Sequence, residues 1–278
     1  MMYPRLLLSK DFLTDDGVIF ISINNQEIAT LKMIMDEIFG YHNFIGIIDW
    51  ESKTKCQNTK TAKKQLQNKQ EYILVYKKKS QRYEFNLRVV ATRKYPDKDD
   101  KGNYRLEQIG EMSASGMRAR ESMVFPINGI MPKEGNQWKI GKSTVDAYIN
   151  RGDIIVKNGR VFLKIRSIDE DEQTEPFWSF IPKEIGTAES ANSELKKLIG
   201  DNGFETVKPV NLIKKLIFHS TSDDDIVMDF FAGTSTTAHA VMDLNNEMSS
   251  HRVFISIQLP EKCGENSDSK KAGYDYIT

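Results

Sequence analysis

The segment from Ile226 to Ala240 limits the fold more than any other part of this 278-residue chain. An apolar run carries a carboxylate, Asp229, near its end and leads into a turn of small residues. Hydroxyl residues then open a helix that we expect from about Thr236 to Leu244. Small residues let a backbone approach a ligand closely, and the first N–H groups of a helix are free to donate to an anion. The pattern predicts a ligand-binding turn at the carboxyl end of a strand, with a purely structural turn as the alternative.

The flanking sequence also has the pattern of an α/β domain. The continuous apolar run over residues 18–23 predicts a strand covered on both faces, as in a parallel sheet. Apolar residues spaced by three and four predict a helix over residues 28–38, ended by Gly40. Further strands are expected over residues 44–48 and 72–76.

Two further expectations concern the ends of the chain. A helix over residues 4–14 is expected to turn Leu7, Leu8 and Phe12 inward. Beyond residue 207 the α/β pattern returns, with a helix through Leu212 and a strand over residues 253–258. We expect the two ends of the chain to build one sheet.

Between about residues 85 and 205 the sequence changes to short apolar pieces, scattered glycines and polar loops. Asn158-Gly159 between apolar residues is a hairpin signal. This region is interpreted as an inserted α+β module. The predicted organisation is therefore residues 1–84 and 206–278 as two parts of one domain, with residues 85–205 between them.

Zero net charge conceals a strongly basic segment. Residues 51–82 contain nine lysines and one arginine against two glutamates. This density is typical of a loop that contacts phosphates, although a solvated lysine-rich surface is an equal alternative. The candidate DNA contacts in it are Lys53, Lys55, Lys60, Lys63 and Lys64. Arg118 and Arg120, in a stretch of small residues, are candidates for a second loop over DNA, with a solvated loop as the alternative.

Several classes of protein are excluded by composition. The longest apolar runs fall short of the roughly 20 residues that span a bilayer, and no signal peptide begins the chain, so we expect a cytoplasmic protein without membrane contact. Cys56 and Cys263 match no metal-ligand spacing and are expected to be reduced. The histidines form no metal spacing either, so no metal site is predicted.

Ordered motifs along the chain carry a resemblance to a known family. Lys208-Pro209 precedes the turn Asp229-Phe230-Phe231-Ala232-Gly233, and Thr236-Thr237-Ala238-His239-Ala240 follows it. Upstream stand Tyr3-Pro4-Arg5-Leu6 and Glu71-Tyr72-Ile73-Leu74-Val75-Tyr76. In these segments the sequence resembles adenine-specific DNA methyltransferases of the permuted β type, in particular the modification subunits of type III restriction systems. The resemblance implies an α/β S-adenosylmethionine-dependent methyltransferase sheet with an inserted α+β target-recognition module.

The resemblance also implies a cofactor, a reaction and partners. S-adenosylmethionine would donate a methyl group to adenine N6 in double-stranded DNA after the base is flipped. A homodimer, a restriction subunit and a separate chain with the catalytic loop remain open as partners. The residues implied in cofactor binding are Lys208, Pro209, Asp229, Phe230, Phe231, Gly233, Thr236, Thr237 and Gln258.

Two departures from the family pattern matter for function. The second glycine of the turn is Ser235, which would be strained if the position needs a positive φ. The catalytic Asp-Pro-Pro-Tyr loop is missing from the sequence, so no catalytic residue is assigned. We expect a chain truncated at both ends that cannot transfer a methyl group efficiently alone. The alternatives are a catalytically dead DNA-recognition or assembly module complemented by another chain, and methylation of cytosine N4.

Overall fold

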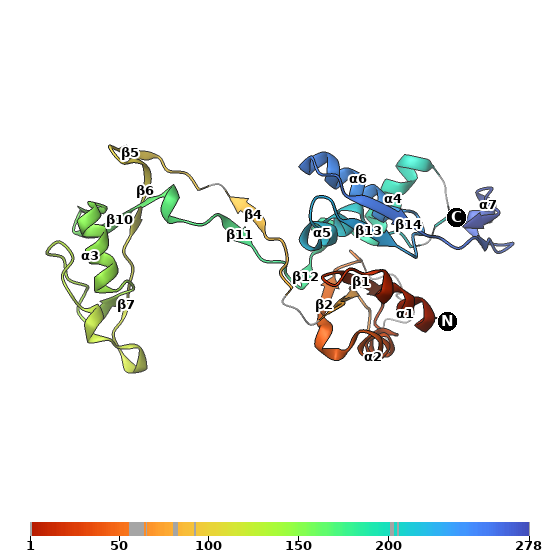
Figure 1. The fold of residues 1–278 in the computed structure, drawn as a ribbon, viewed down its shortest axis with the longest axis horizontal. Helices are drawn as coiled ribbons and strands as arrows, with labels where there is room; N and C mark the ends of the chain where they lie inside the picture. The colour runs from red at the N-terminus through yellow and green to blue at the C-terminus, as the bar shows by residue number, and fades with distance from the viewer. Residues whose placement is uncertain are drawn as a thin grey trace. The chain divides into compact units, whose positions relative to one another are not determined.

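The computed structural model describes residues 2–55, 64, 66–79, 83–91, 93–200, 203–204 and 206–277 (Figure 1). The chain forms two compact units, one made of residues 1–88 and 176–278 and the other of residues 89–175. No helix within the described ranges is long and apolar enough to cross a membrane. Seven α-helices and sixteen strands among these residues confirm the α/β class.

A four-stranded sheet forms the centre of the first unit. Its order is β1 (Val18–Ile23), β3 (Glu71–Lys77), β2 (Phe44–Trp50) and β12 (Phe180–Ile181). β3 is antiparallel to both β1 and β2, and β12 is parallel to β2. The parallel pairing predicted for residues 18–23 is therefore wrong. Its continuous apolar run reflects cover on both faces of the sheet, and that cover does not depend on strand direction.

Alternate residues of β3 show how both faces are covered. Leu74 and Tyr76 pack in a cluster with residues of α2 (Ile28–Phe39), whereas Ile73 and Val75 pack with α5 (Val210–Ser220). All four side chains are buried because successive strand residues point to opposite faces and each face meets a helix. The predicted α2 is confirmed, and Gly40, at φ 88°, follows its last residue.

The predicted inward face of the first helix is wrong. In α1 (Tyr3–Phe12) the buried residues are Leu6 and Ser9, whereas Leu7, Leu8 and Phe12 are exposed. Apolar residues line both sides of this helix, so periodicity predicts the helix but not the side that α2 covers. The Ser9 hydroxyl is satisfied within the helix, donating to the Leu6 carbonyl at 2.7 Å.

The carboxyl-terminal part of the first unit has a sheet of its own. β13 (Ile226–Asp229) and β14 (Val253–Ser256) pair in parallel, joined by α6 (Thr236–Met248). No described hydrogen-bonded ladder joins this pair to the four-stranded sheet, so the expected single sheet is not formed. The two parts instead share α5, which packs on β3 through Leu212 and on α6 through Ile217.

The second unit is built on an antiparallel sheet. Its order is β5 (Asp97–Asp99), β6 (Gly102–Gln108), β10 (Arg160–Arg166) and β9 (Ile154–Lys157). The predicted hairpin is confirmed, because Asn158 and Gly159 both have positive φ between β9 and β10. α3 (Lys142–Arg151) places Val145 in a core with Phe125, Trp138 and strand residues of β10.

Shorter elements complete both units. In the second unit, β7 (Glu111–Ser113) pairs with β8 (Asn136–Trp138). β4 (Arg88–Ala91) pairs with β11 (Gln173–Glu175). The first unit also contains α4 (Ala188–Ile199), α7 (Asp268–Lys271), β15 (Glu261–Lys262) and β16 (Tyr276–Ile277).

The inserted unit is smaller than the module expected over residues 85–205. Residues 176–205 belong to the first compact unit. The reason is a long-range pairing: Ile181 is fully buried opposite Trp50, and the Trp50 indole N–H donates to the Gly186 carbonyl at 2.9 Å. The scattered polar composition of this stretch does not reveal that pairing.

Candidate functional site

The predicted ligand-binding turn lies where β13 ends and α6 begins. The turn is closed against β14, because the Ala232 N–H donates to the Ile257 carbonyl and the Ile257 N–H to the Asp229 carbonyl. Since β13 and β14 run parallel, their carboxyl ends meet at this edge. The strand–turn–helix arrangement predicted from the sequence is therefore confirmed, and it presents the first residues of α6 beside the sheet edge.

Asp229 braces the turn with both carboxylate oxygens. Oδ1 accepts from the Phe231 N–H at 3.0 Å, and Oδ2 accepts from the Thr237 hydroxyl at 2.6 Å. These bonds connect the end of β13 to the first turn of α6. A carboxylate acceptor makes stronger hydrogen bonds than a neutral one, so Asp229 fixes the conformation of the turn.

Gln258 braces the turn from the other strand. Its Oε1 accepts from the Gly233 N–H at 2.8 Å. Gly233 has φ 49°, and a Cβ added there would meet only the Phe231 carbonyl oxygen, at 3.8 Å. The backbone at Gly233 is therefore open to a bound molecule, while Gln258 holds its N–H from the side of β14.

Ser235 adopts the strained backbone that its place in the motif predicts. Its φ is 56° and ψ 32°, in the left-handed region, directly before the first residue of α6. A non-glycine residue pays about 1 kcal/mol in this region. The turn therefore holds its shape against a local conformational cost.

We predict that Ser235→Gly stabilises the chain by about 1 kcal/mol and tightens cofactor binding, because glycine adopts the left-handed conformation without that cost. Urea unfolding with and without S-adenosylmethionine measures both effects. Ser249→Gly is the matched control, since Ser249 has φ 55° but follows the far end of α6. Equal tightening of cofactor binding by both variants would show that strain in the turn is not what limits affinity.

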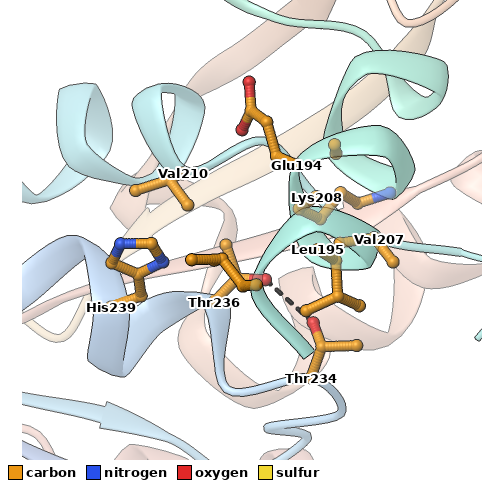
Figure 2. A pocket seen from close by; sticks show the side chains of 10 residues that line it. Glu194, Leu195, Val207, Lys208, Val210, Thr234, Thr236 and His239 are labelled. Carbon is orange, nitrogen blue, oxygen red and sulfur yellow. Dashed lines mark hydrogen bonds between the residues drawn. The ribbon is translucent and has the colours of Figure 1, made fainter. Parts of the chain in front are cut away.

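A pocket lies between this turn and α4 (Figure 2). Thr234 and Thr236 line one side, and their hydroxyls are 2.9 Å apart. Lys208 and Val210, at the start of α5, line another side. The remaining lining residues are Ala191, Glu194, Leu195, Leu198, Val207 and His239. Hydroxyl residues of the turn and mostly apolar residues of α4 thus line the same pocket.

The pocket contains only some of the residues predicted to bind the cofactor. Of that set, Lys208 and Thr236 line it. Asp229, Thr237 and Gln258 shape the turn through their hydrogen bonds, and Gly233 lies within it. The predicted set therefore divides into residues at the pocket and residues that hold the turn.

Lys208 and Pro209 connect the pocket to the four-stranded sheet. The Lys208 ammonium lies 2.6 Å from a Glu71 carboxylate oxygen and 5.1 Å from the centroid of the Trp50 ring. Pro209 precedes α5 and packs against Gly186, where an added Cβ would lie only 2.6 Å from the Pro209 Cβ. Gly186 therefore allows the close approach that places Lys208 at the pocket.

The two phenylalanines of the turn have different environments. Phe230 packs against the cluster that contains Leu6 and Leu74, whereas Phe231 is 44% exposed. The Arg5 guanidinium lies 5.3 Å from the centroid of the Phe231 ring. Phe230 therefore anchors the turn in the core, and Phe231 is the aromatic side chain available to a ligand.

The candidate DNA contacts are distributed over both units. Lys55 and Lys64 are exposed and Lys53 is half-buried in the first unit, while Lys60 and Lys63 lie outside the described residues. No carboxylate of the described residues forms an ion pair with Lys53, Lys55 or Lys64. Arg118 and Arg120 are exposed in the second unit. Within the described ranges, no group of His, Cys, Asp or Glu side chains is arranged to hold a metal.

Sequence reasoning missed the part of the pocket that α4 contributes. Glu194 and Leu195 belong to a helix of ordinary amphipathic pattern, with no motif that marks a ligand. The only available signal was the capping box at Thr187, whose hydroxyl accepts from the Ser190 N–H at 3.2 Å and fixes where α4 begins. His239, one turn into α6, also lines the pocket.

The sequence matches the DNA methylase family model N6_N4_Mtase over residues 1–266. The chain therefore belongs to this family, which confirms the resemblance. The Mod subunit of the type III restriction-modification enzyme StyLTI from Salmonella typhimurium is 32% identical over 289 residues, covering 99% of this chain and 42% of that protein.

Two other comparisons found a further relative and a solved structure. The type II methyltransferase M.KpnI from Klebsiella pneumoniae is 30% identical over 301 residues, covering 100% of this chain and 70% of that protein. A solved M1.HpyAVI–SAM complex shares 14% identity with a TM-score of 0.41, covering 98% of this chain and 82% of the solved chain. The chain spans about half the length of the type III relatives that it matches.

Proposed function

We propose that residues 1–278 bind S-adenosylmethionine and recognise DNA, as part of a restriction-modification methyltransferase that acts on adenine N6. The observation that carries this proposal is the turn after β13, which Asp229 and Gln258 brace next to the pocket of Figure 2. A sulfonium donor already activates its methyl group, so the protein's task is to hold donor and acceptor in line. A preformed turn with an accessible backbone suits that task.

The pocket suggests how the cofactor would be oriented. The Thr234 and Thr236 hydroxyls and the start of α6 offer donors to a carboxylate, which the methionine part of the cofactor carries. Lys208 approaches the same pocket from α5. Exposed Phe231 offers a ring face to the adenine part or to a flipped base.

A direct test mixes the chain with tritiated S-adenosylmethionine and duplex DNA, alone and together with a polypeptide that carries an Asp-Pro-Pro-Tyr loop. We expect transfer of label to the DNA only when the second polypeptide is present, with N6-methyladenine as the modified nucleoside. N4-methylcytosine would instead establish the cytosine reaction. If no label reaches the DNA with or without the second polypeptide, the result would contradict the methyltransferase assignment.

A second candidate function is a DNA-recognition or assembly module without catalysis of its own. The observation that favours it is the exposed pair of basic residues, Arg118 and Arg120, in the second unit. Such a module would work with another chain or, by analogy with Mod subunits, with a restriction subunit. DNA binding without S-adenosylmethionine binding would support this module over the first proposal.

The basic segment supplies a test of the DNA part of the proposal. Replacing Lys53, Lys55, Lys60, Lys63 and Lys64 by glutamine is expected to weaken DNA binding and flatten its salt dependence. Removing one lysine–phosphate interaction lowers the slope of log K against log salt by about 0.9. Fluorescence anisotropy with a labelled duplex between 50 and 200 mM salt, roughly the range over which such interactions act, measures this slope.

Lys79→Gln is the control for this experiment. Lys79 belongs to the same basic segment but pairs with Asp15, so its charge is already neutralised. This variant should leave the slope unchanged. If the five-lysine variant also keeps the slope and affinity of the parent chain, the segment does not contact DNA.

A further inference from the structure

A buried glutamine in the second unit fixes the backbone of an exposed basic loop. Gln137, on β8, is 2% exposed. Its Nε2 donates to the Arg118 carbonyl at 2.8 Å, and its Oε1 accepts from the Arg120 N–H at 2.7 Å. The side-chain amide therefore pairs with the loop as a neighbouring strand would, with one donor and one acceptor. Both groups of the amide are satisfied, which removes the cost of burying it.

The loop itself is small, basic and exposed. Gly116 has φ 60° and opens a short 3-10 helix that ends at Arg118. The Met117 side chain is fully exposed at the tip. Neither Arg118 nor Arg120 forms an ion pair with a carboxylate in the part of the chain that the structure describes. The loop thus presents two unneutralised guanidinium groups beside an apolar side chain.

Gln137 belongs to the core of its unit as well as to the loop. The next residue, Trp138, is 2% exposed in the core of the second unit, and its indole N–H donates to the Phe125 carbonyl at 2.8 Å. On the other side, Asn136 donates to Glu111 at 2.9 Å. The backbone at Arg118 and Arg120 is therefore tied through one side chain to a rigid scaffold.

We propose that Gln137 is a positioning residue that holds the loop of residues 116–120 as a base-reading element, with Arg118 and Arg120 contacting guanine edges in the major groove of DNA. The inference rests on the proposed function, because it assumes that the second unit binds DNA. It adds to that function the residues that choose the sequence.

The fixed backbone favours base edges over phosphates as the targets. A phosphate accepts hydrogen bonds from many directions, so flexible lysines such as Lys55 are sufficient for that contact. Reading guanine requires a planar guanidinium that reaches O6 and N7 together, which demands a defined starting point on the backbone. Met117 adds an apolar surface of the kind that contacts thymine methyl groups.

The test selects bound duplexes from a randomised DNA pool with the full chain and sequences them. Arg118→Lys and Arg120→Lys keep the charge but lose the two-pronged hydrogen bonding. We expect each variant to lose about 10-fold or more of the preference for guanine at one position, while the salt slope of binding stays that of the parent. Unchanged preferences would overturn the assignment of these arginines to base contacts.

Gln137→Met tests the positioning role, because methionine is similar in size and makes neither hydrogen bond. We expect it to weaken the preferences at the same positions as the arginine variants, with non-specific binding retained. Asn136→Ala is the control, since the Asn136 side chain bonds to Glu111 and not to the loop. Hydrogen exchange of the β10 amides shows whether either variant loses the fold of the unit.

The outcomes separate this inference from the proposed function. A parent chain that binds no DNA would contradict the DNA part of the proposed function. A parent chain with clear preferences that Gln137→Met leaves intact, while β10 stays protected, would overturn the positioning role alone. If the β10 amides of Gln137→Met lose their protection from hydrogen exchange, this variant has lost the fold of the unit. The assignment of the loop to base reading is then decided by the Arg118→Lys and Arg120→Lys variants.

Discussion

Replacing Asp229 by alanine is expected to weaken S-adenosylmethionine binding by about 10- to 100-fold, because the turn loses two hydrogen bonds to a charged acceptor. The Phe231 N–H and the Thr237 hydroxyl both lose their partner. The turn then relaxes from the conformation that faces the pocket. Equilibrium dialysis with radiolabelled cofactor measures the change.

Two variants show whether the effect belongs to the turn. Thr237→Val removes one of the two bonds and should cause a smaller loss than Asp229→Ala. Asp225→Ala removes a carboxylate just before the other end of β13, where it accepts from the Ser222 N–H at 2.7 Å, and should leave cofactor affinity unchanged. Equal losses for Asp225→Ala and Asp229→Ala would contradict a specific role for the turn.

Asp153→Ala is expected to destabilise the second unit by roughly 3 kcal/mol, since it removes the fully buried one of the two carboxylates, Asp153 and Asp99, that pair with the buried Arg166 guanidinium. The Asp153 side chain is fully buried between Arg151 and Arg166, and the Arg166 guanidinium lies 2.7 Å from it. Because Arg151 is partly exposed, we expect a loss of stability at the lower end of the roughly 3 to 5 kcal/mol that breaking a buried ion pair costs. Hydrogen exchange of β10 amides measures the loss, with the β3 amides of the first unit as the internal reference.

Asp146→Ala is the control for this prediction. Asp146 forms a surface pair with Lys142 in the same unit, with both side chains at least half exposed. Surface pairs of this kind contribute little to stability, so protection of β10 should change by less than about 0.5 kcal/mol. Equal effects of Asp153→Ala and Asp146→Ala would show that the buried ion network does not stabilise the unit.

The same network gives the second unit a dependence on acid pH. Burial raises the pKa of Asp153, but hydrogen bonds from Arg166 and Arg151 outweigh it and the net pKa is lowered. Hydrogen bonds from Arg166 and Lys164 lower the pKa of Asp99. Because the folded pKa lies below the unfolded value of about 3.9, this stabilisation is complete above that pH and is lost as the pH falls below it.

The sequence predicts those parts of the fold whose signals are local. β1, α2 and the hairpin at Asn158 follow from hydrophobic period and turn residues, which act over a few positions. The positive φ of Ser235 is predicted by the motif, because Ser235 stands where the family turn has its second glycine and the turn fixes the backbone conformation at that position. Asp229 and Gln258 are predicted to bind the cofactor, and the structure shows that their side chains hold the turn.

The parts that the sequence does not predict depend on long-range partners. The direction of β1 is set by β3, some fifty residues later in the chain, and an apolar run is the same in either direction. The inward face of α1 is decided by α2, and residues 176–205 belong to the first unit because of Ile181 and Trp50. Gln137 has no motif at all, since its role arises from hydrogen bonds across the second unit.

We propose that the turn after β13 binds S-adenosylmethionine. Calorimetric titration of the 278-residue chain with this cofactor tests it most directly, with Asp229→Ala titrated under the same conditions. We expect a saturable one-site isotherm for the parent chain and a much weaker one for the variant. An absence of binding by the parent chain, or identical isotherms for both proteins, would contradict it.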